Sequence, residues 1–118
     1  MSVPLPRLDP AYHAPARIAI ASRLVASERM RFAALRGATG LTAGNLATHL
    51  DALEKAGYVT QRDAIVAKRR GRVIAMTEEG RAAWRAYVAA LEALVAALRE
   101  RPAPPPKAGA SRSDQPES

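Results

Sequence analysis

Apolar residues recur at helical spacing in the first half of the chain. After a short extended arm (residues 1–9), a stripe of them predicts a helix that begins at Pro10 or Pro15 and ends near Ser27, because proline suits a first helical position. Residues 29–40 repeat the pattern over a shorter distance and end in a glycine-containing segment, which predicts a second helix.

A third helix is predicted after Thr42. The Thr42 hydroxyl can accept a hydrogen bond from the backbone N–H of Asn45, and Gly57 suits a left-handed cap at the other end. The turn between the second and third helices is tight. Three short helices with such a turn are typical of a helix-turn-helix motif.

The hydrophobic period changes after Gly57. Residues 58–66 and 72–76 contain β-branched residues and predict two strands, joined by a turn over residues 67–71 in which Gly71 can take a positive φ. The sequence therefore predicts a β-hairpin directly after the helix-turn-helix.

A final helix is expected from about residue 78 to 101, with two acidic residues in its first turn. Part of its apolar stripe has heptad spacing; its members are Trp84, Tyr87, Val88, Leu91, Leu94, Val95 and Leu98. The stripe could fold back onto its own domain or pair with a second copy. Because it exceeds what one small domain can cover, we expect a dimer interface to which Ile18 of the first helix also contributes.

These elements predict a mainly α fold with a small β-hairpin, of the α+β class. One domain would occupy residues 10–101. Residues 102–118 are rich in proline and serine and predict a disordered tail. The 118-residue length allows a single domain of ordinary size.

Composition narrows the function. The chain carries a formal charge of +7, which favours a nucleic-acid partner. It has no cysteine, which excludes disulfides and thiolate chemistry, and its two histidines do not form a metal-site motif. No catalytic motif is present, so we expect no enzyme activity and no cofactor. With no signal-like or membrane-spanning stretch, we expect a soluble, cytoplasmic protein.

The positive charge is densest in the predicted hairpin. Four cations fall within five residues, namely Lys68, Arg69, Arg70 and Arg72. Their simplest partner is phosphate. Charged hairpin tips also serve solubility alone, but the preceding helix-turn-helix favours DNA.

The third helix has an exposed face without charge. Its first turns present Ala43, Gly44, Asn45 and Thr48 on the side opposite the apolar stripe. Small residues let a helix approach the major groove, and asparagine and threonine side chains can contact base edges. The pattern indicates that this helix contacts bases while the hairpin binds phosphates.

The run LTAGNLATHLDALEKAGYV, followed by KRRGR and MTEEGRAAWRAYVAALEAL, resembles small winged helix-turn-helix transcriptional regulators of the MarR- and ArsR-like type. The resemblance implies a homodimer that binds operator DNA, with the third helix as recognition helix and the hairpin as wing. By position it adds Thr42 and His49 to the recognition helix and Arg31 as a phosphate contact. His49 could equally be structural.

We expect a dimeric repressor acting on a pseudo-palindromic operator. Two alternatives are a winged-helix protein-interaction module and a non-specific architectural DNA binder. MarR-like relatives often respond to small phenolic or lipophilic molecules, but the sequence selects no effector.

Overall fold

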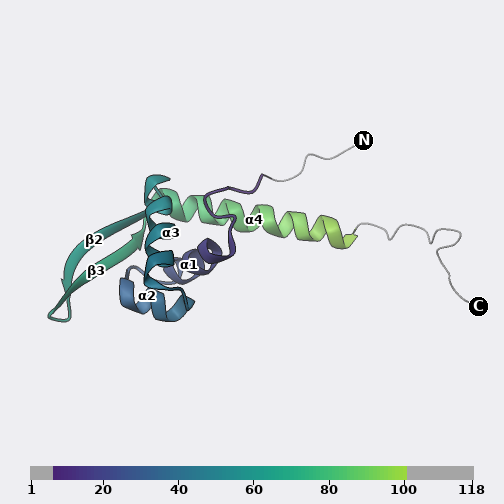
Figure 1. The fold of residues 1–118 in the computed structure, drawn as a ribbon. Coiled ribbons are helices and arrows are strands. Elements are labelled where there is room, and N and C mark those ends of the chain that lie inside the picture. The colour runs from purple at the N-terminus through teal and green to yellow at the C-terminus, as the bar shows by residue number, and fades with distance from the viewer. Residues whose placement is uncertain (1–6, 101–118) are drawn as a thin grey trace, which may run out of the picture.

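Three short helices, a three-stranded antiparallel sheet and a long terminal helix make up residues 7–100, the part of the chain that the computed structural model describes (Figure 1). The elements are α1 (Pro15–Val25), β1 (Met30–Arg31), α2 (Phe32–Thr39), α3 (Ala43–Lys55), β2 (Val59–Val66), β3 (Arg69–Met76) and α4 (Glu78–Glu100). The strand order in the sheet is β1-β3-β2. The predicted fold class is confirmed. The tail expected over residues 102–118 and most of the N-terminal arm lie outside the described residues.

The helix boundaries follow local chemistry. Helix α1 begins at Pro15 and not at Pro10, because Asp9 folds the preceding segment into a turn in which its carboxylate accepts the backbone N–H of Ala11 at 2.9 Å. Helix α3 begins as expected, since the Thr42 hydroxyl accepts the backbone N–H of Asn45 at 3.1 Å. The left-handed Gly57, with φ of 85°, follows the end of α3.

Strand β1 was not predicted. Its two residues pair antiparallel with β3, Met30 opposite Ile74 and Arg31 opposite Val73. Helix α2 consequently begins only at Phe32. A two-residue strand leaves no periodic pattern, and its partner lies far along the chain, so the sequence carried no local sign of it.

The hairpin turn differs from the expected one. The ladder of β2 and β3 continues to the pair Val66 and Arg69, so the turn consists of Ala67 and Lys68 alone. These two residues have positive φ values of 54° and 64°, as a type I′ turn requires, whereas Gly71 lies within β3. The left-handed conformation costs about 1–2 kcal/mol for a non-glycine residue, so the turn is not favoured by its own sequence.

The core lies between the helices and the sheet. Its fully buried aliphatic residues come from every helix of the helix-turn-helix and include Ile20, Leu35 and Leu50. An aromatic group closes it toward α4: the Tyr12 ring stacks on Tyr58 with centroids 4.9 Å apart and meets the edge of Trp84 at 5.1 Å.

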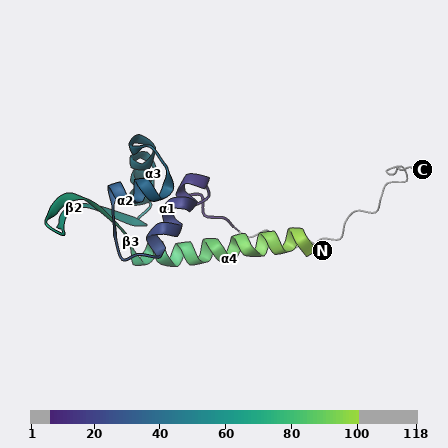
Figure 2. The same ribbon diagram turned by 90° about the horizontal axis from the view of Figure 1, so that it is seen from below.

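Helix α4 divides into two halves. Trp84 and Tyr87 are buried in the core of their own domain, so these two side chains do not belong to the exposed stripe that we expected to face a second copy. The remainder of the helix projects beyond the other elements (Figure 2). There Val95 and Leu98 are 40% and 61% exposed. Ile18 is partly buried against the same core.

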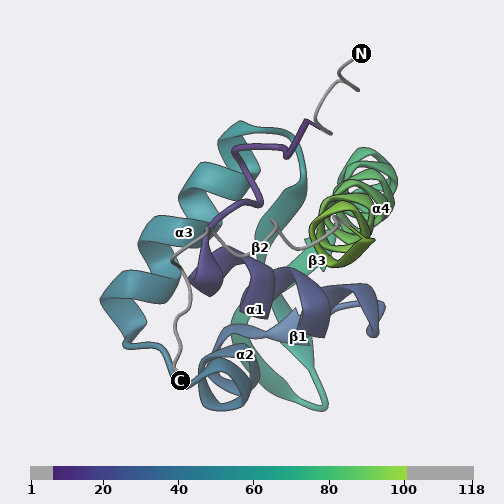
Figure 3. The same cartoon turned by 90° about the vertical axis from the view of Figure 1, so that its right-hand side faces the viewer.

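Viewed along α4, the helix lies to one side of α1 and the sheet, and α3 lies on the other side (Figure 3). Arg81 links α4 to α1, because its guanidinium donates to the carbonyl oxygens of Val25 and Ser27 at 3.1 and 2.9 Å. Val25 is the last residue of α1, and Ser27 follows the end of the helix. The long helix is thereby fixed against the helix-turn-helix.

Candidate nucleic-acid interface

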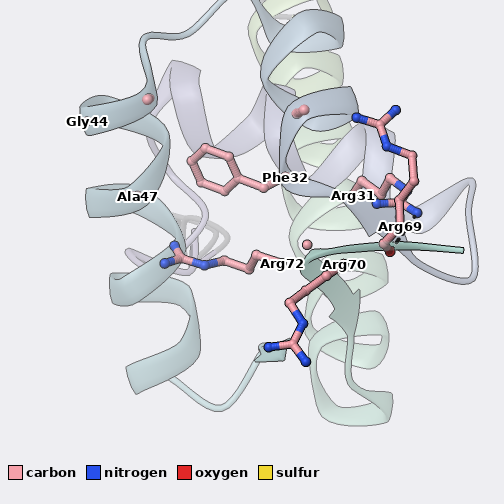
Figure 4. Close-up of a pocket in the computed structure, with 10 residues that line it drawn as sticks. Arg31, Phe32, Gly44, Ala47, Arg69, Arg70 and Arg72 are labelled. Carbon is pink, nitrogen blue, oxygen red and sulfur yellow. Dashed lines mark hydrogen bonds between the residues drawn. The ribbon is translucent and has the colours of Figure 1, made fainter. Parts of the chain in front are cut away.

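A groove of about 650 Å³ separates the beginning of α3 from the hairpin. The side of the groove formed by α2 and α3 is apolar. The opposite side, formed by β1 and β3, is cationic (Figure 4). The lining residues are Arg31, Phe32, Ala33, Ala43, Gly44, Ala47, Arg69, Arg70, Gly71 and Arg72. The fold thus brings the predicted recognition helix and the predicted wing to opposite sides of one groove.

The first turns of α3 are free of bulk and charge on the surface. Gly44, Asn45 and Thr48 are exposed, and a Cβ atom on Gly44 would meet no atom within 4 Å. Ala43 and Ala47 face the groove, whereas Asn45 and Thr48 do not line it. Thr42 is exposed and caps the helix. The helix therefore presents two faces, one toward the wing and one outward.

The cations of the hairpin do not form a single cluster at the tip. Lys68 lies in the turn, and Arg69, Arg70 and Arg72 lie on β3. Arg72 extends from β3 toward α3, and its guanidinium carbon lies 5.3 Å from the centre of the Phe32 ring (Figure 4). Arg72 is thus positioned at the base of the groove and the other cations nearer the tip.

A polar chain links Arg72 to α3. The Gln61 amide nitrogen donates to carboxylate oxygens of Asp51 and Glu54, both at 2.9 Å. Its carbonyl oxygen accepts from Arg72 at 3.5 Å. Phe32 and Gln61 were not predicted as residues of the interface, because their contacts with Arg72 form only when β2, β3 and α2 assemble.

Arg31 does not extend freely toward solvent. Its guanidinium donates to the carbonyl oxygen of Val66 and, at 3.2 Å, to that of Arg69. The Arg31 side chain therefore contacts the backbone of the hairpin. That Arg31 binds phosphate stays a prediction.

His49 lies beside α1. The Arg17 side chain donates to the His49 Nδ1 atom at 3.1 Å, and Arg17 also donates to the Ala11 carbonyl oxygen at 3.3 Å. Because Nδ1 accepts, the neutral ring carries its proton on Nε2. His49 thus has a structural contact with α1, and that it contacts DNA stays a prediction.

The shifted titratable groups of the described residues lie in the aromatic group and not in the groove. The hydrogen bond from the Tyr58 hydroxyl to Asp9, together with burial, raises the Tyr58 pKa to about 12. Burial also raises the pKa of Tyr12 and that of Tyr87. Residues 7–100 bring together no group of three His, Asp or Glu side chains that could hold a metal ion.

Residues 16–95 match the family model of the winged helix DNA-binding domain. The chain belongs to this family. A sequence relative, an uncharacterised protein of Methanocaldococcus jannaschii, is 33% identical over 72 residues, which cover 61% of this chain and 78% of the relative.

Solved structures agree with the family. A transcriptional regulator homologue from Pyrococcus horikoshii OT3 superposes with a TM-score of 0.70 at 26% identity, covering 75% of this chain and 87% of that one. A MarR-family transcriptional regulator from Silicibacter pomeroyi shares the fold with a TM-score of 0.59 at 19% identity, covering 80% and 62%. The predicted winged helix-turn-helix is confirmed, and the winged-helix chain is a DNA-binding transcriptional regulator. None of the helices within residues 7–100 is long and apolar enough to cross a membrane.

Proposed function

We propose that this winged-helix protein acts as a homodimeric repressor that occludes a pseudo-palindromic operator. The observation that carries the proposal is the groove between α3 and the hairpin, with an apolar floor on one side and arginines on the other. A sugar–phosphate strand offers matching surfaces, because its deoxyriboses are largely apolar and its phosphates are anionic.

In this arrangement α3 enters the major groove. Its small residues Ala43 and Gly44 permit close approach, and the exposed Asn45 and Thr48 contact base edges. The wing then follows the backbone or the minor groove, where Lys68, Arg69 and Arg70 neutralise phosphates. Asp51 and Glu54 lie in later turns of α3, and Gln61 binds both carboxylates.

The dimer is proposed from the projecting half of α4. One face of this half is apolar and consists of Leu91, Leu94, Val95 and Leu98. Val95 and Leu98 are exposed in the single chain. Pairing of two such helices would remove this apolar surface from water. Two-fold symmetry would then place two copies of α3 about one DNA turn apart.

The test begins with a duplex selected by the full-length protein from a randomised library. Binding of this duplex and of a shuffled duplex is measured by fluorescence anisotropy across a salt series. Repressor function predicts that the selected duplex binds at least ~10³-fold more tightly at physiological salt and contains an inverted repeat. Equal, steeply salt-dependent binding of both duplexes would instead favour an architectural DNA binder. No binding to either would favour a protein-interaction module.

We also propose a place for an effector. A recess between the segment before α1 and the first half of α4 is lined by Arg7, Leu8, Asp9, Pro10, Ala83, Ala86 and Tyr87. The Asp9 carboxylate already accepts hydrogen bonds from the Ala11 N–H and the Tyr58 hydroxyl, so Arg7 is the charged group of the recess that would bind an aromatic carboxylic acid. This site would be supported if 4-hydroxybenzoate releases the selected duplex from the wild-type protein but does not release it from the Arg7→Ala variant.

A further inference from the structure

We propose that Arg31 is a positioning residue that holds the hairpin in its DNA-binding orientation. Its guanidinium reaches across β3 to the two residues that flank the turn, Val66 and Arg69. The inference deepens the proposed function, since it concerns the wing of the same interface.

The position of Arg31 in the fold suits this role. It belongs to β1, where it pairs with Val73, and it immediately precedes α2. Its backbone is therefore fixed to the helix-turn-helix, while its side chain is fixed to the far end of the hairpin. Figure 4 shows the Arg31 side chain close to Arg69. The residue connects the two parts that must contact DNA together.

Gly71 supports the same conclusion. It lies inside β3, where glycine is unfavourable, and its φ is not positive. A Cβ atom at this position would lie 3.2 Å from the Arg31 Nη1 atom. Glycine within a strand marks the close approach of another group, and here that group is the Arg31 guanidinium.

The turn itself needs such support. Type I′ turns favour Asn-Gly or related pairs, but Ala67 and Lys68 form this one with positive φ. A turn that its own residues disfavour opens readily unless other contacts hold it. Arg31 supplies charged donors to carbonyl oxygens on both sides of it.

The role can be tested without DNA by amide hydrogen exchange at residues 66–70. Arg31→Ala should accelerate exchange there by about tenfold, the effect expected from losing hydrogen bonds to a charged donor. Arg31→Lys should behave similarly, because one ammonium does not reproduce the planar fork of a guanidinium. Ala67→Asn, which favours the left-handed conformation, should slow exchange again in the Arg31→Ala background. Unchanged exchange in Arg31→Ala, with the fold intact by circular dichroism, would overturn the proposal.

Gly71 provides an independent variant. Gly71→Val should accelerate exchange at the tip of the otherwise wild-type protein, because its side chain displaces the guanidinium. In the Arg31→Ala background the same substitution should have no such effect and should even favour the strand. Equal effects in both backgrounds would contradict the proposed contact.

Binding of the selected duplex distinguishes positioning from direct phosphate contact. Arg31→Ala should weaken binding several-fold while the slope of log K against log salt stays unchanged. Loss of one phosphate contact would instead reduce the slope by about 0.9. A reduced slope with normal exchange at the tip would assign Arg31 to the backbone of DNA. If the wild-type protein binds no duplex, the proposed function fails, whereas the exchange measurements still decide the role of Arg31.

Discussion

A Cβ atom on Gly80 would lie 2.1 Å from the carbonyl oxygen of Tyr58. The first turn of α4 therefore rests directly on the backbone that leads into β2. Three hydrogen bonds hold this contact. The Thr77 backbone N–H donates to the Tyr58 carbonyl oxygen at 2.9 Å, the Thr77 hydroxyl donates to that of Gly57 at 2.7 Å, and the Tyr12 hydroxyl donates to that of Gly80 at 2.8 Å. The position of the long helix relative to the wing depends on this junction.

Gly80→Ala should destabilise the protein by about 3 kcal/mol, because the added methyl group meets rigid backbone. The free energy of unfolding in urea measures the change. Gly37→Ala is the matched control: it lies in α2, has an ordinary φ and has no atom within 4 Å of the added Cβ atom. This control should gain about 0.5–1 kcal/mol. Similar losses for both variants would show that the close contact is not decisive.

Asn45 and Arg70 should contribute to DNA binding in different ways. Asn45→Ala should weaken binding of the selected duplex by about 1–3 kcal/mol and leave binding of shuffled DNA nearly unchanged. Arg70→Ala should weaken both and reduce the salt slope by about 0.9. Anisotropy titrations at several salt concentrations measure both quantities. If Asn45→Ala lowers the affinity for both duplexes equally, Asn45 does not contact bases.

The projecting half of α4 should carry dimerisation. Leu98→Glu places a charge on its exposed apolar face and should shift the protein toward monomer at micromolar concentration, as sedimentation equilibrium would show. Ala93→Glu adds the same charge on the opposite face of the helix and should leave the dimer intact. A wild-type protein that sediments as a monomer would rule out the proposed dimer.

The three tyrosines of the chain should titrate late. Each has a raised pKa in the fold, that of Tyr58 to about 12, above the ordinary value of 10. The unfolded chain therefore loses these protons first, and the stability that depends on the protonated hydroxyls is present below pH 10 and falls as the pH rises toward 12.

Tyrosinate absorbance near 295 nm provides the measurement. In the folded protein it should rise only above pH 10, and in urea it should rise around pH 10. Between pH 10 and pH 12, the Tyr58→Phe variant should lose less stability than the wild-type protein does. A normal titration of all three hydroxyls in the folded protein would contradict the burial of the aromatic group.

Much of this protein follows from local sequence. The cap at Thr42, the left-handed Gly57 and the spacing of the buried leucines determine α3, because each acts within a few residues. The same holds for the existence of the hairpin and for its high density of cations, although its turn is two residues long and three of the cations lie on β3. Local preference and the hydrophobic pattern agree at these places, so the winged helix-turn-helix could be predicted.

Tertiary structure decided the rest. The family resemblance predicts a phosphate contact for Arg31, and nothing in the sequence indicates its contacts with Val66 and Arg69, which exist only once β1 pairs with β3. Likewise, one helical stripe on α4 contains both buried Trp84 and exposed Leu98. Periodicity specifies which side of a helix is apolar. It does not specify where along that side the neighbouring elements end, because this depends on contacts between residues distant in sequence.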